Sequence, residues 1–110
     1  MSTQTIPTPT QHPEATSHLD AGTAVFTFWS DPGHAWLEVP RRLLEQLGLS
    51  REISGYSYQN RDAQIVYLEE DCDATKLLQV FDTHGIKYRF DEQYREHIFI
   101  RGLPHYAGGK

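Results

Sequence analysis

The chain has 110 residues, of which 38% are hydrophobic, and it carries a net charge of −5 at pH 7. This size accommodates one small domain with flexible ends and excludes a second hydrophobic core. The mild acidic excess disfavours binding to nucleic acid or to anionic membranes, and no apolar run approaches the roughly 20 residues that span a bilayer. Because Cys72 has no cysteine partner and the first residues lack signal-peptide features, we expect a cytoplasmic protein.

The two ends of the chain differ in composition from its middle. Residues 1–22 consist mostly of Thr, Pro, Gln, Ser and His, which cannot offset the entropy of ordering, so a disordered tail is expected there. His12 and His18 within it are interpreted as solvated side chains. A single domain is predicted over residues 23–101, followed by a C-terminal tail over 102–110.

The first half of this domain predicts a hairpin followed by a helix. Residues 23–29 are rich in β-branched and aromatic side chains and predict a strand. The sequence Asp31-Pro32-Gly33 is typical of a turn, and residues 35–39 then alternate as a half-buried strand does. Pro40 suits the start of a helix, and Gly48 suits its end.

The second half predicts two further strands, a longer helix and a last pair of strands. Alternation predicts strands at 53–58 and 64–68, the second of them central, and helical periodicity over 74–81 ends at a glycine. Residues 86–90 and 97–101 are predicted to pair as outer strands. The resulting order, β-β-α-β-β-α-β-β, predicts an α+β domain with a mostly antiparallel sheet and both helices packed on one face.

One candidate chemistry is a cysteine hydrolase. Cys72 falls at a helix start, where a thiolate is favoured, and His34 falls at a turn, where a general base could stand. Asp31 or Glu38 would orient the His34 ring. The acidic residues beside Cys72 oppose this role because they raise the pKa of a thiol, and the alternative is a small buried packing residue.

The segment around His34 also carries a resemblance. Gly33-His34-Ala35-Trp36-Leu37-Glu38-Val39 resembles the strand that bears the catalytic histidine in transglutaminase-like proteins. In that family the cysteine precedes the histidine. Here Cys72 follows His34, an order similar to the permuted one of some papain-like folds. The resemblance implies a catalytic pair formed by Cys72 and His34.

The acidic run Glu69-Glu70-Asp71-Cys72-Asp73 has a second reading. Its carboxylates could hold a hard cation, but no glycine-containing loop with the spacing of a calcium site follows. Capping of the helix by Asp71 or Asp73 explains the acids equally well. We therefore expect neither a metal nor a cofactor.

A longer segment resembles the swapped-hairpin DNA-binding domains of bacterial transition-state regulators and antitoxins. The resemblance is carried by Trp36-Leu37-Glu38-Val39-Pro40-Arg41-Arg42-Leu43-Leu44-Glu45-Gln46-Leu47-Gly48-Leu49 and Ile65-Val66-Tyr67-Leu68. It implies that Arg41 and Arg42 face the DNA phosphates. The acidic surface elsewhere opposes the electrostatic attraction that drives such binding.

Aromatic side chains suggest a third use. Tyr56 and Tyr58 are predicted on one face of a strand, and Trp36 can join them in an exposed patch suited to a partner protein. Packing in the core is the alternative use of Trp36.

Taken together, Ser30-Asp31-Pro32-Gly33-His34-x-Trp36-Leu37 and Glu69-Glu70-Asp71-Cys72-Asp73-Ala74 resemble a group of small proteins of unknown activity carried on bacterial plasmids, phages and integrated elements. The resemblance implies an accessory protein whose partner is a host or mobile-element protein. The leading hypothesis is noncatalytic protein binding through Trp36, Tyr56 and Tyr58. The hydrolase and the DNA-binding regulator are the alternatives, and the oligomeric state stays open.

Overall fold

The structure, a computed structural model, describes residues 19–20 and 22–108. Its strands belong to one six-stranded sheet, and two α-helices accompany them. The elements in chain order are β1 (Leu19–Asp20), β2 (Thr23–Ser30), β3 (Ala35–Pro40), α1 (Arg41–Gln46), β4 (Tyr58–Gln59), β5 (Ile65–Glu69), the π-helical turn η2 (Glu70–Ala74), α2 (Thr75–Thr83), β6 (Lys87–Tyr94) and the 3-10 helix η3 (Phe99–Gly102).

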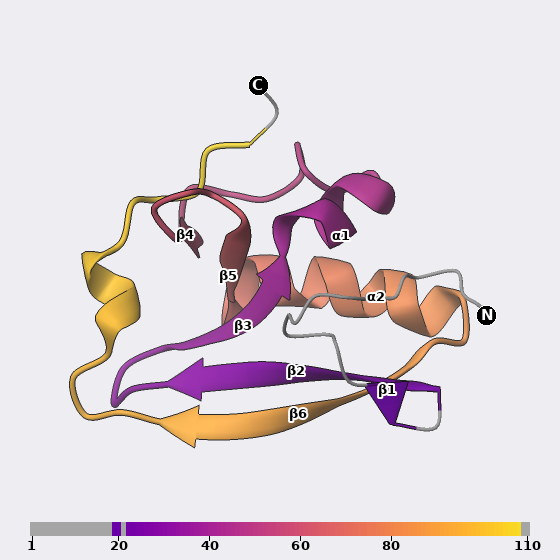
Figure 1. Cartoon of the computed structure of the whole chain (residues 1–110), viewed down its shortest axis with the longest axis horizontal. Helices are drawn as coiled ribbons and strands as arrows, with labels where there is room; N and C mark the ends of the chain where they lie inside the picture. The colour runs from indigo at the N-terminus through magenta and orange to yellow at the C-terminus, as the bar shows by residue number, and fades with distance from the viewer. Residues whose placement is uncertain (1–18, 21, 109–110) are drawn as a thin grey trace.

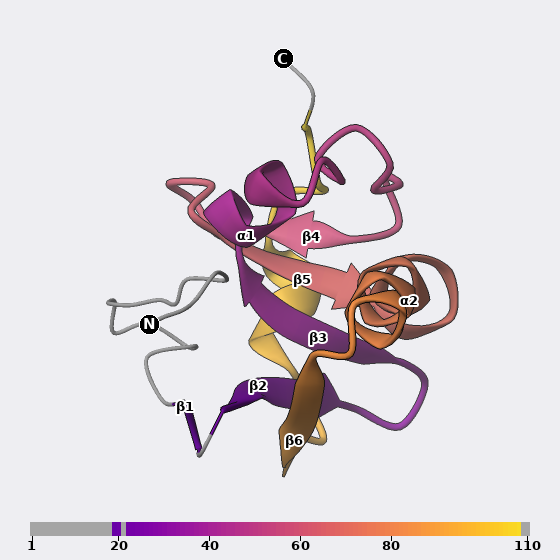
Figure 2. The ribbon, with the colours of Figure 1, turned by 90° about the vertical axis from the view of Figure 1, so that its right-hand side faces the viewer.

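The predicted α+β class and the mostly antiparallel sheet are confirmed. The strands follow one another in the order β1-β2-β3-β5-β4, and β6 also pairs with β2. The β2–β6 pair is parallel, whereas the other paired strands run antiparallel. Figure 2 shows β2, β3, β5 and β4 following one another from bottom to top.

The predicted hairpin forms between β2 and β3. Trp29 lies directly opposite Trp36 in the antiparallel register. Asp31 fixes the connecting turn because its carboxylate accepts the backbone N–H groups of Gly33 at 2.9 Å and of His34 at 2.8 Å. The alternation of β3 therefore places Trp36 on one face of the sheet and Leu37 on the other.

Both helices pack on the Leu37 face, as the sequence predicts. The buried core there combines side chains of the sheet with those of the two helices: Leu37, Val39, Val66 and Leu68 with Leu43, Leu44, Leu77 and Phe81. The opposite face is covered by the C-terminal segment, with a smaller buried cluster formed by Trp36, Tyr67, Ile98 and Ile100. Figure 1 shows the helices and the yellow C-terminal segment on different sides of β3 and β5. The sheet is therefore buried on two faces.

The helix ends lie where glycine permits them. Gly48 follows α1 with φ of 73°, and Gly85 follows α2 with φ of 69°. Both values lie in the left-handed region, which residues with a Cβ atom rarely adopt. The predicted roles of these two glycines are confirmed.

The strand predicted over residues 53–58 is wrong except at its last residue. Only Tyr58–Gln59 forms β4, and the preceding residues form turns around the buried carboxylate of Asp73. Asp73 accepts hydrogen bonds from the backbone N–H and the hydroxyl of Ser54 and from the hydroxyl of Ser57. These side-chain interactions replace the ladder that the alternating pattern suggested.

The last predicted pair of strands is also wrong. Residues 97–101 do not pair with β6, because Phe99–Gly102 forms the short 3-10 helix η3. β6 instead extends to Tyr94 and lies parallel to β2 along its whole length, from Thr23 opposite Lys87 to Ser30 opposite Tyr94. The predicted antiparallel partner of β6 is therefore replaced by a strand from the start of the domain.

The C-terminal residues assigned to a tail pack on the domain. Tyr106 is buried in the core of the helix face, and its backbone N–H donates to Ser57 O at 2.8 Å. His105 forms an isolated bridge with Tyr58. The domain therefore extends beyond Arg101. Most of the N-terminal tail predicted over residues 1–22, with His12 and His18, lies outside the described residues.

The two α-helices are α1 and α2, with six and nine residues. No helix within residues 22–108 has the length and apolar character needed to cross a membrane.

Candidate functional site

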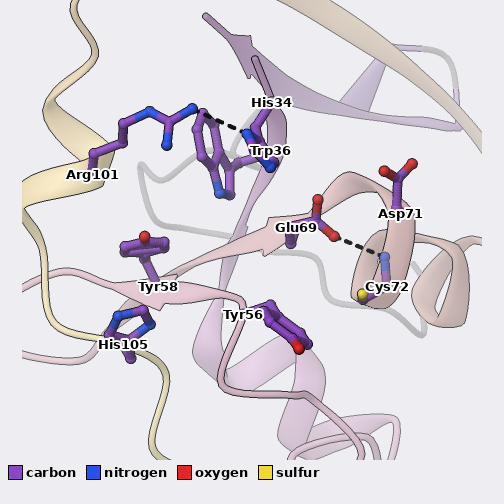
Figure 3. A pocket seen from close by; sticks show the side chains of 9 residues that line it. All are labelled: His34, Trp36, Tyr56, Tyr58, Glu69, Asp71, Cys72, Arg101 and His105. Atoms are coloured by element: carbon purple, nitrogen blue, oxygen red, sulfur yellow. Dashed lines mark hydrogen bonds between the residues drawn. The ribbon is translucent and has the colours of Figure 1, made fainter.

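An open cleft of about 300 Å³ lies at the end of the sheet where the β2–β3 turn, the start of α2 and the C-terminal segment meet. Nine residues line it, and they come from four separate parts of the chain (Figure 3): His34 and Trp36; Tyr56 and Tyr58; Glu69, Asp71 and Cys72; Arg101 and His105. The fold therefore gathers most of the residues that the sequence singles out. We refer to this site as the cleft.

The three aromatic residues predicted to bind a partner all line the cleft. Trp36 is buried, with 2% of its surface exposed, and the Tyr58 ring contacts it edge to face at 6.2 Å between centroids. The ring of His105 also packs against Tyr58, with 4.7 Å between the two ring centroids. Tyr56 is 69% exposed. The cleft thus has a buried indole in its wall and an exposed tyrosine at its rim.

The indole nitrogen of Trp36 has no hydrogen-bond partner although it is buried. The indole nitrogen of Trp29, its neighbour across the hairpin, donates to Glu38 Oε1 at 2.8 Å. Leaving a buried donor unsatisfied costs about 1–3 kcal/mol. In Figure 3 the nitrogen of Trp36 is on the edge of the ring that faces Tyr58, Tyr56 and Glu69. The unsatisfied donor is therefore buried on the Glu69 side of the ring, away from Arg101 and His34.

Arg101 supplies the positive charge of the cleft. Its Nε donates to Asp31 Oδ2 at 2.5 Å and its Nη2 donates to Asp31 Oδ1 at 3.1 Å. These hydrogen bonds hold the pKa of Asp31 well below its usual range, against the opposing effect of burial. The guanidinium also lies over the Trp36 ring, 5.3 Å from its centroid. The C-terminal segment is thereby tied to the β2–β3 turn.

The tautomer of His34 follows from its contact with Arg101. Nη2 of Arg101 lies 3.1 Å from Nδ1 of His34. Because a guanidinium only donates, Nδ1 accepts and the ring proton of neutral His34 is on Nε2. Protonating Nδ1 would place two donors face to face. His34 therefore presents an N–H donor to the cleft.

Neither carboxylate expected to orient His34 contacts its ring. Asp31 accepts the backbone N–H of His34 rather than a ring nitrogen, and Glu38 accepts from Trp29. Arg101 occupies the position that an orienting carboxylate would take in a catalytic triad. This arrangement differs from the one that the hydrolase hypothesis requires.

Cys72 is exposed at the π-helical turn that precedes α2, so the alternative of a buried packing residue is wrong. Its backbone N–H donates to Glu69 Oε1 at 2.9 Å, which makes Glu69 the N-cap in place of the expected Asp71 or Asp73. Local desolvation, a hydrogen bond to Glu69 and the charges of Glu69, Asp73 and Asp71 raise the pKa of the Cys72 thiol. The thiol is accessible and poorly ionised.

His34 and Cys72 lie in the same cleft but do not form a pair. No hydrogen bond joins their side chains in the described part of the chain, whereas each has another partner there: Arg101 for His34 and Glu69 for Cys72. Figure 3 shows Glu69 between the two, with the sulfur of Cys72 turned away from the ring of His34.

The position of Tyr56 depends on the buried carboxylate of Asp73. Ser54, which holds the backbone N–H of Tyr56 through its Oγ at 3.1 Å, donates that hydroxyl to Asp73 Oδ2 at 2.7 Å. Lys76 donates to the other carboxylate oxygen at 3.0 Å. Burial raises the pKa of Asp73, but hydrogen bonds from Ser57, Ser54 and Lys76 outweigh it and leave the pKa lowered.

The two arginines predicted to face DNA lie away from the cleft, on α1. Arg41 is used within the domain: it donates to Ala63 O at 2.5 Å and to Gln59 Oε1 at 2.6 Å, and it lies over the ring of Tyr106. Arg42 is exposed. Arg41 is thus partly buried and engaged within the domain, whereas Arg42 is available to solvent.

Among residues 22–108, no group of three or more His, Cys, Asp or Glu side chains is placed to hold a metal ion.

No protein-family model matches this chain, and comparison with curated protein sequences and with solved structures found no match. Function is therefore inferred from the residues and the geometry of the cleft.

Three residues of the cleft were missed by the sequence analysis. Arg101 was assigned to a strand, His105 to a tail, and Glu69 to the acidic run as a candidate cation ligand and as a charge beside Cys72, not as the N-cap or as a wall of the cleft. The aromatic and apolar residues around His105 were a signal that this segment packs on the domain. Nothing near Arg101 indicates its pairing with Asp31, because the two are separated by 70 positions.

Proposed function

We propose that this protein is a noncatalytic accessory protein that acts by binding a partner protein through the cleft. The observation that carries the proposal is the arrangement of Trp36, Tyr58 and the exposed Tyr56 around an open cleft that also holds an arginine. Tyrosine, tryptophan and arginine are the side chains enriched at the centres of protein–protein interfaces.

The rigidity of the cleft supports this proposal. The Asp31–Arg101 pair and the hydrogen bonds to Asp73 fix the two segments that bear its walls. A preorganised surface loses little side-chain freedom on association, so more of the contact energy is retained as affinity. Such a surface suits a partner that docks without remodelling the domain.

A cysteine hydrolase is the second candidate, favoured by the presence of Cys72 and His34 in one cleft. A thiol with a raised pKa is a weak nucleophile at neutral pH, and a His34 whose Nδ1 accepts from Arg101 lacks the carboxylate that orients a catalytic base. We therefore rank hydrolysis below binding.

A DNA-binding regulator has less support. Arg41, one of its two expected phosphate contacts, is engaged by Ala63, Gln59 and Tyr106 inside the domain. The net charge of −5 opposes association with a polyanion.

The biological setting of the proposal comes from the sequence resemblance alone. The segments around His34 and Cys72 resemble those of small proteins carried on bacterial plasmids and phages, and we propose that this chain serves such an element in the bacterial cytoplasm. Its partner would then be a protein of the host or of the element itself.

Photocrosslinking from the rim of the cleft tests the proposal. We would replace Tyr56 with p-benzoylphenylalanine, irradiate the protein in extract of a bacterial host, and identify the adducts. The matched control replaces Tyr94, which is 54% exposed on β6 and does not line the cleft. We expect one protein adduct from position 56 that excess unlabelled protein abolishes.

Two results would contradict the proposal. One is the absence of a competed adduct at position 56, and the other is the same adduct at equal yield from position 94, which would place the contact outside the cleft.

A further inference from the structure

The cleft has ends of opposite charge. Arg101 and the N–H group of His34 lie at one end, whereas Glu69 and the exposed Asp71 lie at the other (Figure 3). Tyr56 and Tyr58 stand beside the space between these ends. A ligand that matches this arrangement carries an anionic group and a cationic group, joined by a segment that can lie against aromatic rings.

The donors at the positive end are available to a ligand. Arg101 uses Nε and Nη2 on Asp31 and His34, so its Nη1 group remains for another acceptor. His34 presents its Nε2–H because Nδ1 is occupied. The indole nitrogen of Trp36 also has no partner, but it is buried and lies on the edge of the ring away from Arg101 and His34. Arg101 and His34, from two segments of the chain, thus offer the donors from which an incoming carboxylate would gain hydrogen bonds.

The negative end is suited to a cation. Glu69 is 7% exposed and its carboxylate caps η2, and Asp71 follows it as an exposed residue of the same turn. An ammonium or guanidinium group would therefore meet acceptors there.

We propose that the cleft recognises a segment of the partner protein that bears one acidic and one basic side chain, with the acid bound by Arg101 and His34 and the base bound by Glu69 and Asp71. This inference rests on the proposed function and names the chemistry of its partner. A protein segment fits better than a free small molecule because the cleft is open to solvent and Tyr56 extends from its rim.

The chain contains two tryptophans that make the test specific. Their indole N–H resonances are observed separately in a proton–nitrogen correlation spectrum, and only Trp36 lacks a hydrogen-bond partner, whereas Trp29 is held by Glu38. A ligand that contacts Arg101 is expected to shift the Trp36 resonance, because the guanidinium lies over the Trp36 ring, and to leave the Trp29 resonance in place. The Trp29 signal therefore serves as an internal reference for the fold.

The probes are peptides capped at both ends, in which a lysine and an aspartate are separated by zero, one or two glycines, in both orders. We expect at least one of them to shift the Trp36 resonance saturably at pH 7.5. Companion peptides replace the lysine by glutamine, the aspartate by asparagine, or the lysine by a second aspartate. These companions are expected to bind at least several-fold more weakly, because each loses one charge contact.

Substitutions at each end of the cleft test which residues bind the basic side chain of the peptide and which bind the acidic one. Asp71→Asn should raise the Kd of the best peptide about threefold, as expected for one exposed ion pair. Arg101→Lys should raise it about tenfold, because lysine lacks the planar fork of donors. The matched controls Asp91→Asn on β6 and Arg42→Lys on α1 change the same side chains at exposed positions outside the cleft and should leave the Kd unchanged.

Several outcomes would overturn the inference. Equal binding of the neutral companion would show that charge plays no part, and equal binding of the doubly acidic peptide would indicate a simple anion site. Tighter binding of free 6-aminohexanoate than of any peptide would assign the cleft to a small zwitterion. A competed crosslink at position 56 with no peptide binding would overturn this inference while leaving partner binding intact.

Discussion

Arg101 and Asp31 are joined by two hydrogen bonds across 70 positions of sequence, at 2.5 Å from Nε and 3.1 Å from Nη2. Asp31 is 8% exposed, and the same carboxylate accepts the backbone N–H groups of the turn that it belongs to. One side chain therefore closes the β2–β3 turn and anchors η3 beside it. The positive end of the cleft depends on this pair.

Replacing Asp31 by asparagine should lower the thermal stability of the domain. Asparagine keeps one acceptor oxygen for the turn, but its NH₂ group then faces the guanidinium of Arg101, so the charge-assisted hydrogen bonds are lost. We expect the Tm, measured by circular dichroism, to fall by about 4–8 °C.

The matched control for this change is Asp62→Asn. Asp62 is exposed and also accepts a backbone N–H two residues ahead, that of Gln64 at 3.0 Å. We expect this variant to retain the Tm within about 2 °C. Equal Tm values for the two variants would mean that the pair with Arg101 contributes nothing beyond the turn.

Asp73→Asn should destabilise the protein more strongly. The Asp73 side chain has no exposed surface and accepts from Ser54, Ser57 and Lys76, so an asparagine leaves at least one of these donors unsatisfied. We expect the free energy of unfolding in urea to fall by about 2–4 kcal/mol with an unchanged m value. Asp71→Asn, an exposed change two residues away, should cost less than about 0.5 kcal/mol.

Acid should destabilise the domain through the same two carboxylates. The pKa values of Asp31 and Asp73 are lowered in the folded protein, so the folded state holds their protons less tightly than the unfolded chain does. Their contribution is therefore complete above the unfolded pKa near 4 and is lost as the pH falls through the lowered values. We expect the free energy of unfolding to decline below about pH 4. Asp73→Asn should show a shallower decline, and equal slopes would contradict the assignment.

The pH dependence of Cys72 alkylation distinguishes the protein-binding hypothesis from the hydrolase hypothesis. Because desolvation and Glu69 raise its pKa, alkylation by iodoacetamide should show a pH midpoint above the roughly 8.5 of a free thiol. His34→Ala should leave that midpoint unchanged, and Glu69→Gln should speed alkylation severalfold at neutral pH. A midpoint below 8.5 that rises in His34→Ala would instead establish a catalytic pair.

Part of the cleft follows from the sequence. His34 and Trp36 are placed by a turn and an alternating strand, and Cys72 by the start of an amphipathic helix, all of which are local patterns. Tyr56 and Tyr58 were also expected to join Trp36, although for the wrong reason. They reach the cleft from turns held by Asp73 and from a two-residue strand rather than from one continuous strand.

The hairpin, both helices with their glycine ends, and the placement of Leu37 and Trp36 on opposite faces could be predicted from the sequence alone. These features depend on backbone preferences and on apolar periodicity within a few residues. The parallel pairing of β6 with β2, the contact of Arg101 with Asp31 and the packing of Tyr106 in the core become evident only in the folded structure. Such contacts join distant segments, and their free energy depends on the surface and hydrogen bonds of the whole fold, which no local pattern encodes.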